Sequence, residues 1–154
     1  PSFNGIIQGG ALRGLASSRR PEALGMLLAR VQDGATSLYA RPTAVAALAE
    51  FGKGLERRER ERVLETLIDL LRATHYSVAM AAARGLGVLG APEAIGALET
   101  FARTRVTQEA AVVERVIASL RKQDKVDGSA LQKRVETLGD SLRKLEDQVQ
   151  RLQA

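Results

Sequence analysis

The amino-acid sequence predicts an all-α protein, an α-solenoid of about 7–8 helices arranged as helical hairpins and followed by a C-terminal coiled-coil-like helix. Three observations predict this fold class. Apolar residues recur at helical spacing, related segments reappear every 31 to 38 residues, and the last 26 residues follow a 3.5-residue apolar repeat. No stretch alternates between apolar and polar residues in the way that predicts a strand.

The repeats are clearest in a motif that occurs twice, 71 residues apart. Residues 13–15 (Arg-Gly-Leu) reappear as residues 84–86, and residues 21–25 (Pro-Glu-Ala-Leu-Gly) reappear as 92–96 with one change. Two weaker copies lie between and after them. The equivalent apolar positions are separated by 33, 38 and 31 residues, which is the length of two helices and a turn, and they are Leu15, Leu48, Leu86 and Ile117.

Proline and glycine mark where the helices of each unit begin and end. Pro21, Pro42 and Pro92 each stand at an expected helix start, where the missing backbone N–H removes no hydrogen bond. Gly52 and Gly90 follow apolar-periodic runs, where a helix that ends in the left-handed conformation needs a residue without a Cβ. We therefore expect several short helices joined by tight turns.

Four further glycines recur at equivalent repeat positions, Gly14 with Gly85 and Gly25 with Gly96. We interpret them as places where adjacent helices approach closely, because glycine inside a helix otherwise costs about 0.5–1 kcal/mol relative to alanine. The segment from Gly85 to Gly87 is an unconvincing phosphate-binding loop, since no predicted strand precedes it. Residues 56–62 alternate Glu and Arg, a pattern typical of a solvated helical surface that leads into an apolar-periodic helix at residues 63–71.

The C-terminal segment has a different periodicity, which divides the chain into three parts: a repeat domain at 1–125, a linker at 126–129 and a heptad-repeat helix at 130–154. Asp127 and Gly128 predict the break, and Ser129 with Gln132 fits a capping box. The heptad residues alternate at spacings of four and three and comprise Leu131, Val135, Leu138, Leu142, Leu145, Val149 and Leu152. This pattern predicts either a homodimer through these residues or a helix that packs back on the repeats.

Composition excludes several classes of function. The net charge of +5 is spread over the chain without a basic tract, and aromatic residues make up only 3%, so we expect no nucleic-acid partner. No apolar run approaches the roughly 20 residues of a membrane span, so we expect a soluble chain without a membrane partner. There is no cysteine, and the compartment stays open, with the cytoplasm favoured. Because the chain begins at Pro1, we expect a piece of a longer protein.

Catalytic chemistry has no candidate residues in this sequence. The single histidine, His75, cannot form a three-ligand zinc site, and we expect it in an exposed turn before a helix. The carboxylates of residues 56–65 are interleaved with arginines, unlike a buried acid–base pair. We therefore predict no catalytic, cofactor-binding or metal-binding residue and no enzymatic activity for this chain alone.

Residues 3–15, 44–52 and 78–98 resemble HEAT repeats, and the match includes the Leu-Gly-Ala-Pro-Glu-Ala-Ile segment at 89–95. More narrowly, the chain is similar to the C-terminal helical domain of bacterial zinc aminopeptidases of the aminopeptidase N family. One departure is Ala79, where the repeat consensus has arginine.

The resemblance implies a noncatalytic domain that shapes or caps the catalytic cavity of a parent metallopeptidase, with the catalytic domain of the same polypeptide as its partner. The parent would hold zinc through a His-Glu-x-x-His motif, which this sequence lacks. The alternative is a free-standing HEAT-repeat scaffold for protein–protein interaction, dimerised by its tail helix.

Overall fold

The computed structural model describes residues 3–18, 20–33, 36 and 39–153. This part of the chain is almost entirely helical and contains no strand, which confirms the predicted all-α class. None of its helices is both long and apolar enough to cross a membrane. The seven α-helices and one short 3-10 helix are α1 (Phe3–Ser17), α2 (Pro21–Gln32), α3 (Arg41–Gly52), α4 (Arg57–Leu70), α5 (Tyr76–Leu89), η1 (Pro92–Ala94), α6 (Ile95–Arg103) and α7 (Thr107–Gln153).

The chain forms two compact units, one up to Leu120 and one from Arg121 onward. Helix α7 contributes to both, and it runs without interruption through residues 126–129, where the sequence predicted a linker and a new helix start at Ser129. The predicted break is absent because α7 contains no proline, and Gly128 alone lowers helix propensity by about 1 kcal/mol without removing a backbone donor.

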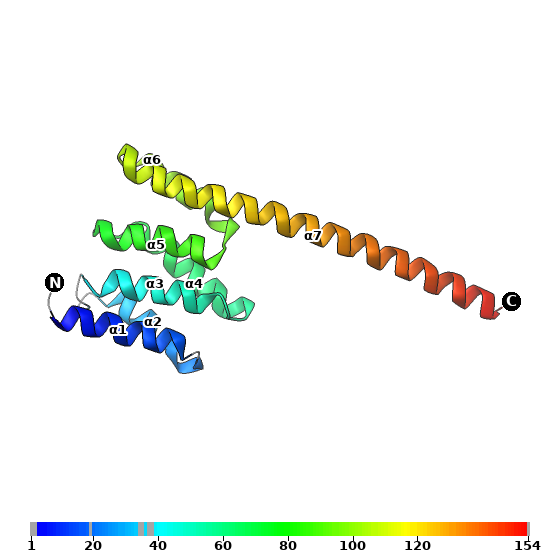
Figure 1. Ribbon diagram of the computed structural model, residues 1–154, viewed down its shortest axis with the longest axis horizontal. Coiled ribbons are helices and arrows are strands. Elements are labelled where there is room, and N and C mark those ends of the chain that lie inside the picture. Colours follow the sequence, from blue (N-terminus) through cyan, green and yellow to red (C-terminus); the bar gives the residue numbers. More distant parts are fainter. Residues whose placement is uncertain (1–2, 19, 34–35, 37–38, 154) are drawn as a thin grey trace. The chain divides into compact units, whose positions relative to one another are not determined.

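The first unit is organised around α3, which contacts α1, α2, α4 and α5. Figure 1 shows α1, α3 and α5 lying side by side, and α5 also contacts α4. Of the equivalent positions that the repeats predicted, Leu48 and Leu86 are fully buried, Ile117 is buried and Leu15 is half-buried. The apolar repeat positions therefore form one continuous core.

The helix boundaries agree with the prolines and with one of the two glycines. Pro21 and Pro92 are the first residues of α2 and η1, and Pro42 is the second residue of α3. Gly90 ends α5 in the left-handed conformation, with φ of 66°. Gly52 does not, because it is the last residue of α3 and Lys53, which caps the helix, is right-handed.

The charged segment before α4 also differs from its prediction at one residue. Arg57 and Glu61 form an exposed ion pair, as a solvated surface requires. Arg60 is half-buried instead, and its guanidinium donates hydrogen bonds to the carbonyls of Leu89 and Gly90 at 3.0 and 2.8 Å. These two carbonyls lie at the end of α5, so Arg60 caps that helix from a neighbouring one.

Close helix approach explains only some of the glycines. A Cβ at Gly85 would lie 3.1 Å from the Cβ of Ala49 in α3, and a Cβ at Gly87 would lie 2.8 Å from Val116 in α7. Gly52 is also tightly packed. The expectation is wrong for Gly14, Gly25 and Gly96, since no atom would lie within 4 Å of an added Cβ there.

The second unit is a single helical segment whose heptad residues are exposed. The exposed fractions of their side chains range from 51% at Val149 to 87% at Leu152. By contrast, the part of α7 in the first unit buries Val113, Ile117 and Leu120.

Candidate functional site

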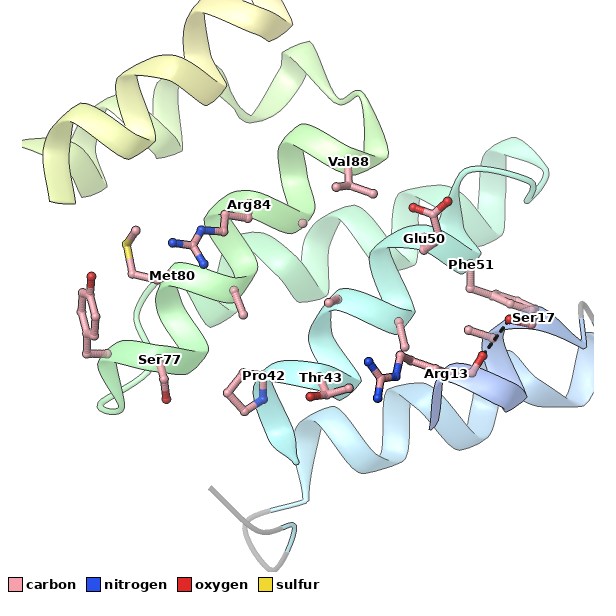
Figure 2. A pocket seen from close by; sticks show the side chains of 16 residues that line it. Arg13, Ser17, Pro42, Thr43, Glu50, Phe51, Ser77, Met80, Arg84 and Val88 are labelled. Atoms are coloured by element: carbon pink, nitrogen blue, oxygen red, sulfur yellow. Dashed lines mark hydrogen bonds between the residues drawn. The ribbon is translucent and has the colours of Figure 1, made fainter. Parts of the chain in front are cut away.

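The largest concave feature of the first unit is an open groove of about 1030 Å³ across α1, α3 and α5 (Figure 2). Its lining is Arg13, Ala16, Ser17, Pro42, Thr43, Ala46, Ala47, Glu50, Phe51, Tyr76, Ser77, Met80, Ala81, Arg84, Gly85 and Val88. The lining is mainly apolar with a few polar side chains, which is typical of a surface that binds an extended or helical peptide.

Small residues give the groove its depth. Ala46 and Ala47 of α3 and Ala81 and Gly85 of α5 lie among its lining residues, and a larger side chain at any of them would occupy the space. Gly85 also allows α5 to approach α3 at Ala49. The repeat glycine that the sequence singled out therefore contributes to both packing and groove shape.

Charge in the groove comes from both ends of the helical layer. Arg13 on α1 and Arg84 on α5 are exposed, and neither guanidinium forms an ion pair with another residue in the part of the chain that the structure describes. Glu50 on α3 is paired with Lys53, with 3.0 Å between Nζ and Oε2. The two arginines leave the groove with positive potential that suits an acidic segment.

Tyr76 lies at the start of α5 and connects the groove lining to α7. Its side chain is 46% exposed, and its hydroxyl donates a hydrogen bond to the carboxylate of Glu109. Desolvation raises the pKa of Tyr76 above its ordinary value of 10.0, and the hydrogen bond and negative charge of Glu109 raise it further. Tyr76 is therefore a protonated donor at neutral pH.

The residues considered for catalysis do not come together. His75 is exposed and precedes α5, as the sequence predicted. No cluster of three or more histidine, aspartate or glutamate side chains able to hold a metal ion occurs among the described residues. The geometry of this region thus provides binding surfaces.

A second candidate surface emerges when the two copies of the 71-residue motif are compared. Gly85 in α5 faces Ala49 of the preceding helix α3, whereas the equivalent Gly14 in α1 has open space around it. Likewise Val78 in α5 is fully buried, and its equivalent Ile7 in α1 is 55% exposed. The same face is covered in the second copy and uncovered in the first.

Two further equivalent pairs extend this difference. Ala82 is fully buried in α5, but Ala11 in α1 is exposed. Ala97 in α6 is half-buried, but Met26 in α2 is 58% exposed. We call this surface the outer face of the first helix pair and define it by Ile7, Ala11, Gly14 and Met26. The sequence pattern marked these positions as repeat-equivalent but could not show which copy lacks a neighbour.

No protein-family model matches the chain, and no curated protein is significantly similar to it.

Proposed function

We propose that this chain is a noncatalytic α-solenoid of HEAT-like hairpins that forms the C-terminal helical domain of a zinc-dependent aminopeptidase and shapes or caps its catalytic cavity. The repeat motifs and the order of helix contacts support the solenoid arrangement. Within it, α3 lies between α1 and α5, as a middle repeat does in a stack where each unit contacts its neighbours.

The observation that carries the proposal is the outer face of the first helix pair. Terminal repeats of an isolated solenoid normally present a polar outer surface. Here Ile7 and Met26 are more than half exposed, beside an uncovered glycine at position 14. An apolar face with a glycine gap suits a helix of a neighbouring domain, which would pack on α1 as α3 packs on α5.

The first test asks whether the outer face has an occupant in the parent protein. Ile7→Lys with Met26→Lys places two charges on exposed positions, so the isolated chain should keep its Tm within a few degrees. In the parent the same change should lower the Tm of the domain and expose it to limited proteolysis. Val106→Lys is the matched control, since Val106 is 67% exposed outside this face.

The parent itself is tested by the reading frame upstream of Pro1. A His-Glu-x-x-His motif there supports the proposal, and an initiation codon directly before Pro1 contradicts it. Zinc would be held by that catalytic domain, so stoichiometric zinc uptake by the isolated chain would also count against the assignment.

The groove favours a second candidate, a free-standing scaffold that binds a partner peptide. Its open shape, small-residue floor and two arginines suit an acidic helical or extended segment. Ala46→Arg would fill the groove and should abolish binding of peptides selected from a displayed library against this chain. Ala29→Arg, on exposed α2 outside the groove, should leave binding unchanged. Equal binding by both variants would exclude the groove.

A further inference from the structure

The strongest unpartnered feature outside these surfaces is the line of seven heptad residues in the second unit. We call it the heptad seam, and its members are Leu131, Val135, Leu138, Leu142, Leu145, Val149 and Leu152. Every one of them is more than half exposed. An uninterrupted row of aliphatic side chains on an otherwise polar helix needs a partner, because scattered apolar residues are ordinary on surfaces but contiguous ones mark interfaces.

The width of the seam indicates which kind of partner it fits. A helix that packs on a globular surface normally carries a broader apolar stripe, with apolar residues also at one flanking position. Here the flanking positions are polar or small throughout, and they are Gln132, Arg134, Gly139, Ser141, Glu146 and Gln148. Such a narrow stripe fits another helix with the same 3.5-residue period rather than the broader surface of the repeats.

We propose that the heptad seam pairs with the seam of a second copy of this chain to form a parallel two-stranded coiled coil. Val135 and Val149 occupy heptad position a, and leucine occupies all four d positions. β-branched residues at a with leucine at d favour two parallel strands. This inference is independent of the proposed function, since it uses none of the residues of the groove or the outer face.

The flanking residues allow the parallel register without repulsion. In that register Arg134 lies opposite the partner's Gly139, and Ser141 lies opposite the partner's Glu146. No like charges face each other along the seam. Partner choice therefore depends on the seam itself.

The size of the seam sets the expected strength. A fully buried leucine or valine removes roughly 60–120 Å² of apolar surface, so fourteen partly exposed side chains would remove roughly 500–1,000 Å². Stable interfaces bury about 1,200 Å² or more. The dimer should therefore be reversible, monomeric near about 1 µM and largely dimeric above about 100 µM.

Disulfide trapping tests the pairing and its direction together, because the chain has no cysteine of its own. In a parallel coiled coil Val135→Cys lies opposite itself and should cross-link to a dimer at least tenfold faster than Lys133→Cys, which points away from the seam at position f. An antiparallel pair would instead bring Val135→Cys next to a partner that carries Leu145→Cys. Preferential linking of that mixed pair, or equal rates for the first two variants, overturns the proposal.

Sedimentation equilibrium of the full chain supplies the second measurement. The unsubstituted chain should show a mass that rises from monomer to dimer with concentration, and Leu138→Asp with Leu145→Asp should weaken association at least a hundredfold. Both leucines are exposed, so the helical circular dichroism of the monomer and the Tm of the repeat unit should remain unchanged. A monomer at every concentration, with the tail helical, contradicts the seam as a self-association surface.

Discussion

The two halves of α7 have related apolar periodicity but different surroundings. Up to Leu120 the helix buries Val113, Ile117 and Leu120, spaced by four and three residues, and Val116 packs closely against Gly87. From Arg121 onward the heptad residues at the same spacing are all exposed. Periodicity therefore identifies the face of a helix that favours burial, while the partner of that face is decided by the rest of the fold.

The largest expected difference concerns leucine truncation in the two regions. Leu67→Ala removes a fully buried side chain and should lower the free energy of unfolding by about 2–5 kcal/mol. Leu138→Ala, where the side chain is 63% exposed, should change it by less than about 0.5 kcal/mol in the monomer. Urea denaturation at low micromolar protein concentration measures both, and equal losses would show that the tail has an intramolecular partner.

Glycine substitutions should have opposite signs in the two halves. Gly87→Ala places a Cβ 2.8 Å from Val116 and should destabilise the repeat unit by about 1–3 kcal/mol through overpacking. Gly128→Ala meets no atom within 4 Å and should stabilise α7 by about 1 kcal/mol. Thermal unfolding followed by circular dichroism distinguishes them, and a stabilising Gly87→Ala would contradict the tight contact.

Arginine truncation separates a tertiary contact from an exposed ion pair. Arg60→Met removes the donors to Leu89 and Gly90 while keeping the aliphatic stem, and it should cost about 1–2 kcal/mol. Arg57→Met removes an exposed pair with Glu61 and should cost no more than about 0.5 kcal/mol. Chemical denaturation gives both values, and indistinguishable variants would rule out the capping role of Arg60.

The smallest effect concerns the titration of Tyr76. Its folded-state pKa is raised, so the hydrogen bond with Glu109 contributes stability below the unfolded pKa of 10.0 and is lost as pH rises through the folded value. With Tyr39→Phe as background, Tyr76 is the only tyrosine and its phenolate absorbance should appear above pH 10.0. Adding Glu109→Gln should move the midpoint toward 10.0, and no movement would contradict the contact between α5 and α7.

The sequence anticipated the helical class because its signals are local. Proline at helix starts, left-handed Gly90 and the apolar spacing each depend on a few consecutive residues. It misjudged residues 126–129 because a helix tolerates one glycine when nothing else interrupts its backbone hydrogen bonds. It also assigned Arg60 to a solvated surface, since the carbonyls that it caps lie about 30 residues away in sequence.

The candidate surfaces were predictable to unequal degrees. The heptad seam was visible residue by residue because its period lies within one helix. The groove was not, since its lining comes from three helices whose spacing depends on packing. The glycines show the same limit, because Gly14 and Gly85 share a motif yet only Gly85 has a neighbouring helix against it.

The sequence by itself determined that the chain is helical, where most helices begin and which positions favour burial, because these properties depend on backbone conformation and on side chains within a few turns. Only the tertiary structure decided which equivalent positions are covered, because burial depends on what lies opposite. Ile7 and Val78 occupy the same repeat position, and α5 has a preceding helix against its face where α1 has none in the described chain.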